Sequence, residues 1–241
     1  MKRLKNFLFL LAAAPVVAFG AGATVHLDKA PINLSDQDSL QRGARMFVNY
    51  CLNCHSASMM RYSRLQDLGL TEEQIKDNLL FASEKPGDPM HVAMRHSDGK
   101  AWFGATPPDL SVIARSRGAD WLYTYLRSFY RDDTRATGWN NTVFDKVGMP
   151  HVMWNLQGEM VPVYKKDGEH EVIERLVLAK PGSVSLAEYD AMVGDLVNYL
   201  QWMGEPAQNQ RKQLGVIVLL FLGVFFVVAY YLKKEFWKDI H

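Results

Sequence analysis

The stretch NYCLNCHSAS, residues 49–58, contains both cysteines of the 241-residue chain. Cys51 and Cys54 are separated by two residues, and His55 follows directly. This C-x-x-C-H spacing is the attachment pattern of a c-type haem, in which two thioethers reach two vinyl groups and the histidine turns beneath the iron. We therefore predict Cys51 and Cys54 as the covalent anchors of one haem c and His55 as the proximal iron ligand. The other ring nitrogen of His55 is expected to donate to a carbonyl oxygen, which would fix the tautomer.

Three other uses of the cysteine pair fit the chain less well. One close pair cannot staple a domain of this size, which excludes a disulfide scaffold. A structural zinc site needs four ligands, usually two such pairs or a distant histidine pair. A thioredoxin-type dithiol needs a strand before the motif and a βαβ frame around it, whereas the pattern here predicts a helix before the motif. Zinc binding and a dithiol remain as minor alternatives.

Two helices are predicted near the ends of the globular part. The first covers 39–50, with Ser39 or Asp38 as its cap and with one apolar stripe. Gly43 lies inside this helix, at a helix-propensity cost of about 1 kcal/mol against alanine, so we expect it to let another backbone approach closely. The second helix covers 185–204 and begins with a capping box. Its apolar seam is Leu186, Tyr189, Val193, Leu196, Leu200 and Met203.

Between these helices the sequence predicts shorter elements. Three helices are expected, in 71–82, in 107–118 and in 119–130, whereas 84–108 and 131–151 are expected to be loops because of their Pro and Gly content or irregular pattern. A single hairpin is predicted over 160–178, where alternating residues flank a KKDG turn signal. The predicted fold is mostly α, with one domain over 24–210.

Both ends of the chain carry targeting or membrane signals. Residues 1–23 combine a basic start, a short apolar run and small residues, which predicts a secretory signal peptide. Residues 214–232 are nineteen residues without a charge, enough to cross a bilayer. We predict a transmembrane anchor over 211–235, a periplasmic domain before it and a cytoplasmic tail over 236–241, in agreement with the positive-inside bias. The expected location is a bacterial inner membrane.

The charge distribution constrains the partners. Residues 21–210 contain 24 acidic and 19 basic residues, although the whole chain has a net charge of +1. An acidic body gives no indication of nucleic-acid binding. It would speed encounter with a basic protein at low salt, although an ordinary solvated surface has the same composition.

A sixth iron ligand has to come from elsewhere in the chain, because electron-transfer haems usually add a methionine or a second histidine. Methionines on amphipathic helices more often fill the core. The remaining candidates are Met90, Met94, Met149, Met153, Met160, His91, His96 and His151. The residues favour Met149, since Gly148 and Pro150 place it in a rigid irregular segment, and leave His151 as the second choice.

The chain resembles the cytochrome c1 family, the haem subunits of bacterial cytochrome bc1 complexes (ubiquinol–cytochrome c reductases). The matching pieces, in the family's order, are CLNCHS, RYSRL, GATPPDLS, IARSRG, GMPH, YLQWMGEP and the C-terminal span. The resemblance implies a class I cytochrome c-like domain with extra loops, and Met149 as the sixth ligand. It also implies that Pro108 lies against the haem, that Arg117 binds a propionate, and that the two end helices pack together.

The resemblance further implies an electron carrier without a catalytic acid or base of its own. The haem would accept an electron from a Rieske iron–sulfur subunit and pass it to a cytochrome c. Cytochrome b, membrane lipid and a second complex in a dimer would be its other partners. Two alternatives stay open: a self-standing membrane-anchored cytochrome c that acts as a shuttle or oxidase subunit, and a periplasmic thiol–disulfide protein.

Overall fold

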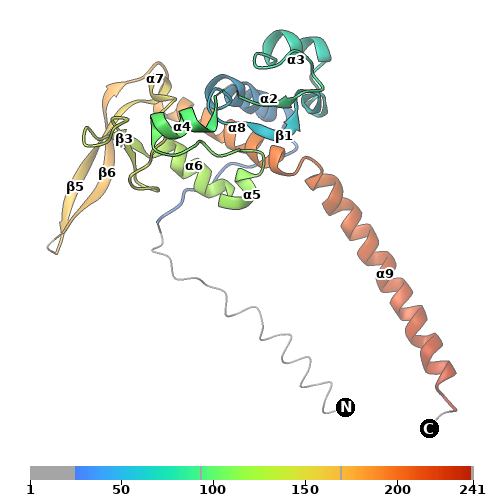
Figure 1. The fold of residues 1–241 in the computed structure, drawn as a ribbon. Coiled ribbons are helices and arrows are strands. Elements are labelled where there is room, and N and C mark those ends of the chain that lie inside the picture. The colour runs from blue at the N-terminus through green and yellow to red at the C-terminus, as the bar shows by residue number, and fades with distance from the viewer. Residues whose placement is uncertain (1–24, 93, 169, 240–241) are drawn as a thin grey trace.

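Two helices, α2 (Gln37–Met46) and α8 (Leu186–Gly204), pack against each other at the centre of the fold. The computed structural model describes residues 25–92, 94–168 and 170–239. Figure 1 shows a body of short helices around this pair, a hairpin that projects from one end and a long helix that leaves from the opposite end. The predicted signal peptide, residues 1–23, lies outside the described residues.

Helix α2 begins earlier than the sequence indicated. Its N-cap is Asp36, whose carboxylate accepts a hydrogen bond from the backbone N–H of Ser39 at 3.0 Å, so the prediction of Ser39 or Asp38 as the cap was wrong. Asp36 suits the position because its side chain satisfies an amide at the open end of the helix. The helix then widens into a π-helical turn, η2 (Phe47–Cys51), that ends on the first cysteine.

Gly43 allows α2 and α8 to approach closely, as predicted. A Cβ atom at this position would lie 2.7 Å from Tyr199 Cβ and would also clash with the backbone carbonyl of Asp195. The predicted packing of the two end helices is therefore confirmed. It matters for function because α2 leads directly into the cysteine motif.

Helix α8 has the capping box that the sequence predicted. The Ser185 hydroxyl accepts from the Glu188 N–H, and the Glu188 carboxylate accepts from the Ser185 N–H at 2.9 Å. Most of the predicted seam is buried, but Leu186 is 40% exposed, because the first turn of the helix extends beyond the core.

The region after the cysteine motif, residues 57–103, contains more regular secondary structure than the sequence predicted. It contains β1 (Ala57–Arg61), the 3₁₀ helix η3 (Tyr62–Leu68), α3 (Glu72–Asn78), β2 (Pro89–Met90) and α4 (His96–Phe103). Strands β1 and β2 form an antiparallel pair. The prediction of a continuous loop over 84–108 was wrong at α4, a weakly amphipathic helix that ends at Gly104 in the left-handed conformation.

The second half of the body contains α5 (Ile113–Arg117), α6 (Ala119–Arg127), β3 (Phe129–Arg131), β4 (Trp139–Asn141) and α7 (Trp154–Gln157). The predicted hairpin is present as β5 (Gly158–Asp167) and β6 (His170–Pro181), which pair antiparallel. The prediction of only one hairpin was wrong, because β3 and β4 also form an antiparallel pair. Helices nevertheless dominate the described residues, with three two-stranded sheets beside them.

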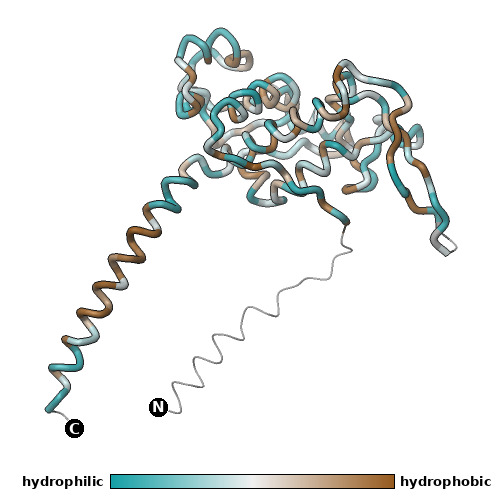
Figure 2. Tube along the Cα trace, turned by 180° about the vertical axis from the view of Figure 1, so that it is seen from behind, coloured by the Kyte–Doolittle hydropathy of each residue, from teal (hydrophilic) through white to brown (hydrophobic). Residues whose placement is uncertain are grey.

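The C-terminal helix α9 (Gln208–Phe236) stands apart from the body. It is long and apolar enough to cross a membrane by length and composition, and none of its most apolar window is buried inside the fold. Figure 2 shows an apolar middle with hydrophilic residues toward both ends. A core helix would have partners that cover its apolar side chains, so this exposure agrees with an anchor.

Candidate haem site

A cavity of about 330 Å³ brings together all six residues that the sequence analysis singled out. They come from four separate parts of the chain and are Cys51, Cys54, His55, Pro108, Arg117 and Met149. The remaining wall is mainly apolar and aromatic, with Tyr50, Phe103, Ile113, Trp121, Tyr125, Phe144, Leu196 and Leu200 among its members. An apolar cavity with a few convergent polar groups is typical of a cofactor site.

The cysteine motif forms a compact turn at the end of α2 and η2. The backbone N–H groups of Cys54 and His55 both donate to the carbonyl of Cys51, at 3.0 and 2.9 Å. Burial raises the pKa of Cys51 to about 12, and burial also raises the pKa of Cys54. Reactive dithiols depend on a lowered thiol pKa, so these surroundings disfavour a thiol–disulfide enzyme.

His55 is buried and oriented by a single carbonyl. Its Nδ1 atom lies 2.7 Å from the carbonyl oxygen of Pro108. A carbonyl only accepts, so Nδ1 carries the proton and Nε2 keeps its lone pair. Burial lowers the pKa of His55, with the Pro108 carbonyl acting in the opposite direction, and the neutral ring is the form that binds a metal. The predicted carbonyl acceptor is thus identified as Pro108.

Two loops are fastened together around this contact. The N–H of Leu110 donates to the carbonyl of Ser56 at 2.8 Å, and the N–H of Ser58 donates to the Asp109 carboxylate at 2.8 Å. Both bonds join residues that closely follow His55 and Pro108 in their two segments. The position of the Pro108 carbonyl is therefore fixed by backbone hydrogen bonds as well as by the restricted proline backbone.

Met149 reaches the same cavity from the loop after β4. Gly148 is required there, since a Cβ atom would lie 2.7 Å from the Phe103 carbonyl. The Met149 sulfur accepts a hydrogen bond from the Tyr125 hydroxyl at 3.4 Å. Among the described residues, no other methionine lines the cavity.

His151, the second choice for the sixth ligand, lies in the aromatic core instead. Its ring stacks on Phe129 with a centroid distance of 5.0 Å and contacts Trp139 edge-on at 5.1 Å. It is 1% exposed and is not among the residues that line the cavity. Of these two candidates for the sixth ligand, Met149 lines the cavity and His151 does not.

Arg117 lies at the exposed rim of the cavity, at the end of α5. Its guanidinium sits 5.1 Å from the centroid of the Trp121 ring. Within the described residues it makes no ion pair, whereas neighbouring Arg115 lies 3.9 Å from Glu205. Arg117 is thus the guanidinium available to carboxylates of a group bound in the cavity.

Sequence reasoning missed two aromatic residues of the site. Trp121 and Tyr125 stand one helical turn apart on α6, and their rings stack at 4.8 Å with an interplanar angle of 11°. The sequence of α6 is rich in aromatic residues. The i, i+4 spacing of Trp121 and Tyr125 places both rings on the same face of the helix, and this spacing could have identified them as a pair.

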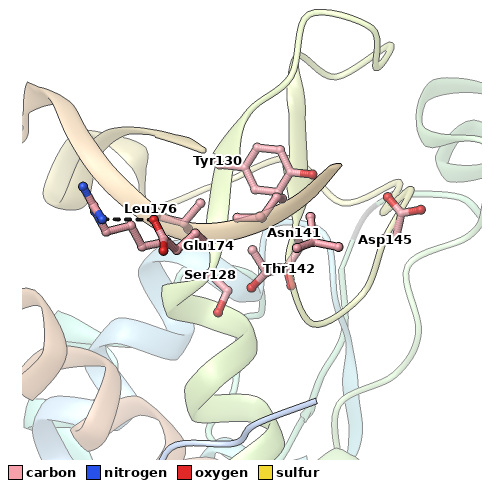
Figure 3. Close-up of a pocket in the computed structure, with 10 residues that line it drawn as sticks. Ser128, Tyr130, Asn141, Thr142, Asp145, Glu174 and Leu176 are labelled. Atoms are coloured by element: carbon pink, nitrogen blue, oxygen red, sulfur yellow. Dashed lines mark hydrogen bonds and ion pairs between the residues drawn. The ribbon is translucent and has the colours of Figure 1, made fainter. Parts of the chain in front are cut away.

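A second pocket, of about 530 Å³, lies between β3, β4 and β6. Figure 3 shows Tyr130, Asn141 and Thr142 on one side of it and Glu174 and Leu176 on the other. None of the six predicted site residues lines this pocket.

The sequence as a whole matches known proteins. A profile of the cytochrome C1 family matches residues 28–240. The chain is 50% identical over 246 residues to cytochrome c1 of Allochromatium vinosum, with all of both chains covered. It is 30% identical over 269 residues to cytochrome c1 of Rhodospirillum rubrum, with 96% of both chains covered. It is also 50% identical over 245 residues, again with full coverage, to a Nitrosomonas europaea protein named ammonia monooxygenase gamma subunit.

The mainly helical fold therefore encloses an apolar cavity that is lined by a histidine and a methionine, which is the class of site that binds an apolar cofactor. The chain belongs to the cytochrome C1 family, which confirms the resemblance seen in the sequence. Membership supports a haem-bearing electron-transfer subunit of a bc1 complex as its functional class.

Proposed function

We propose that this chain carries one haem c, attached through Cys51 and Cys54, with His55 and Met149 as the axial ligands. The observation that supports the proposal most directly is the convergence of all six predicted residues on one cavity. The bound haem would supply a one-electron redox centre. The protein would contribute a neutral imidazole, a thioether, an apolar wall that excludes water, and the Arg117 guanidinium for a propionate. We further propose that the body is a class I cytochrome c-like domain.

The proposed electron route runs from a Rieske iron–sulfur subunit to this chain and on to a cytochrome c. Cytochrome b would be the second integral partner, in a dimer of complexes. The acidic excess of residues 21–210 suits a basic acceptor. A reaction rate with the acceptor that does not change with ionic strength would contradict this electrostatic steering.

We propose that α9 spans the bacterial inner membrane once. Residues 24–210 would lie in the periplasm after removal of the signal peptide, and the short tail after the anchor would lie in the cytoplasm. The charges Arg211 and Lys212 at one end of the apolar run and Lys233 and Lys234 at the other support the ends of the span.

Two relatives with equal identity have different names, so identity alone does not choose the complex in which this chain works. A self-standing membrane-anchored cytochrome would share the haem and the anchor. Family membership favours the bc1 complex over a monooxygenase complex and over a self-standing cytochrome.

The test is affinity purification of the tagged full-length chain in detergent, followed by a haem stain of a denaturing gel. Covalent haem should stain the chain, and Cys51→Ala with Cys54→Ala should abolish the stain. Cytochrome b and an iron–sulfur subunit should co-purify. An unstained wild-type chain would contradict the haem proposal. A stained chain that purifies alone would support the self-standing cytochrome, and one that purifies with monooxygenase subunits would contradict the bc1 assignment.

A further inference from the structure

The hydroxyl of Tyr125 and the sulfur of Met149 form a hydrogen bond across the wall of the cavity. The Tyr125 oxygen lies 3.4 Å from the Met149 sulfur, and both residues line the cavity. A phenol near neutral pH is a donor, and a thioether sulfur is a weak acceptor, so the direction of this bond is fixed.

The Tyr125 ring is held by two neighbouring aromatic rings, which makes the hydroxyl a fixed donor. Trp121 stacks on it at 4.8 Å, and Phe129 meets it edge-on at 5.1 Å. The carbonyl of Tyr125 accepts from the Asn141 side-chain amide at 2.8 Å, which also fixes the backbone. Tyr125 is 8% exposed, so water does not compete freely for its hydroxyl.

A thioether sulfur has two lone pairs. If one binds iron, the other can accept the hydrogen bond from Tyr125 without leaving the metal. A donor at this position withdraws electron density from the sulfur and makes it a poorer donor to iron. Electron donation from the sulfur stabilises oxidised iron more than reduced iron. The hydrogen bond from Tyr125 weakens this donation and therefore favours the reduced state.

We infer that Tyr125 is a positioning residue for Met149, which aims the thioether into the cavity and raises the reduction potential of the centre through this hydrogen bond. The inference rests on the proposed function, because it takes Met149 as an iron ligand. It adds a residue that the sequence analysis did not single out.

The test is Tyr125→Phe in the full-length chain, with the midpoint potential measured by spectroelectrochemistry in detergent. We expect haem staining and the methionine-to-iron charge-transfer band to persist. The equilibrium constant for reduction should fall about fivefold, which is about 40 mV for a one-electron couple. Tyr123→Phe is the matched control, because Tyr123 is on the same helix and its ring faces Arg127 instead, with a centroid distance of 4.4 Å. An unchanged potential in Tyr125→Phe, or an equal shift in the control, would overturn the inference.

A double-mutant cycle separates tuning of the ligand from a general effect on the fold. In a Met149→Leu background the hydrogen bond has no acceptor, so Tyr125→Phe should leave the potential unchanged. An equal shift in both backgrounds would overturn the inference.

Failure of the proposed function gives a different result. An unstained wild-type chain contradicts haem attachment, and an unchanged spectrum in Met149→Leu contradicts Met149 as ligand; either overturns the inference as well. If both of those tests succeed and only Tyr125→Phe has no effect, the proposed function stands and the inference alone fails.

Discussion

His55 and Pro108 are joined by a hydrogen bond in which the imidazole Nδ1–H donates to the proline carbonyl at 2.7 Å. This bond assigns the proton to the nitrogen that faces the loop and leaves the other nitrogen for a metal. It also links the cysteine motif to the loop before α5, two segments that the sequence shows far apart.

Asp109→Asn should weaken the fastening of the loop. The Asp109 carboxylate accepts from the backbone N–H groups of Ser58 and Ser111, both at 2.8 Å. Burial alone would raise the pKa of Asp109, but these hydrogen bonds outweigh it and hold the pKa below the ordinary value of 3.8. A depressed pKa stabilises the fold above that value, and the stabilisation is lost as the pH falls through the folded-state pKa.

We therefore expect Asp109→Asn to lower the free energy of unfolding at pH 7 by on the order of 1 kcal/mol, with a smaller difference from wild type near pH 3. Urea unfolding at both pH values measures this. Asp133→Asn is a suitable control, because its carboxylate is 91% exposed and lies 3.6 Å from Arg131. A difference between Asp109→Asn and wild type that is the same at both pH values would count against the explanation.

Met149→Leu should leave the haem covalently attached and lower its midpoint potential strongly, since a methionine ligand raises the potential. The iron should also become open to added ligands such as carbon monoxide, detected by optical spectroscopy. Met153→Leu is the control: Met153 lies in the same segment and is buried, but does not line the cavity. Identical spectra and potentials for Met149→Leu and wild type would exclude Met149 as a ligand.

Arg117→Leu should lower the midpoint potential while the haem stain persists. A cation beside the site favours the reduced, less positive state, and its removal therefore favours the oxidised state. Arg115→Leu removes a guanidinium two residues away that lies near Glu205, so we expect a smaller shift. The proposed contact with a propionate is wrong if the two variants shift the potential equally.

Gly43→Ala should destabilise the domain. The added methyl group would meet the Asp195 carbonyl and Tyr199 Cβ, so α2 and α8 have to separate. Overpacking of this kind costs about 1–3 kcal/mol, partly offset by the better helix propensity of alanine. Chemical denaturation followed by circular dichroism measures the change. Gly87→Ala, where a Cβ atom meets nothing within 4 Å, should be close to neutral.

Features set by short spacings were predictable from the sequence. The C-x-x-C-H motif, the capping box of Ser185 and Glu188, and the hairpin around the KKDG turn each depend on residues within a few positions of one another. Helix α4 was missed because its sequence, HSDGKAWF, has a glycine inside and little amphipathic pattern. The cap of α2 was misplaced because Asp36, Asp38 and Ser39 all satisfy the same local rule.

The candidate site was predictable as a set of residues but not as a geometry. Family resemblance named Pro108 without showing that its carbonyl holds His55. Tyr125 and Trp121 carry no motif, and only the packing of α6 against the cavity gives them a role. Such contacts depend on tertiary positions that local sequence patterns do not encode.

The hydrogen bonds of His55 and Met149 have a consequence for the speed of electron exchange. Each candidate ligand is held by a donor or acceptor on a neighbouring segment, at 2.7 Å for His55 and 3.4 Å for Met149. Groups that are fixed in advance have little to rearrange when the charge at the centre changes. With a haem bound as proposed, the two contacts would therefore keep the reorganisation energy small, and the mainly apolar cavity wall would add to this by leaving few solvent dipoles to turn.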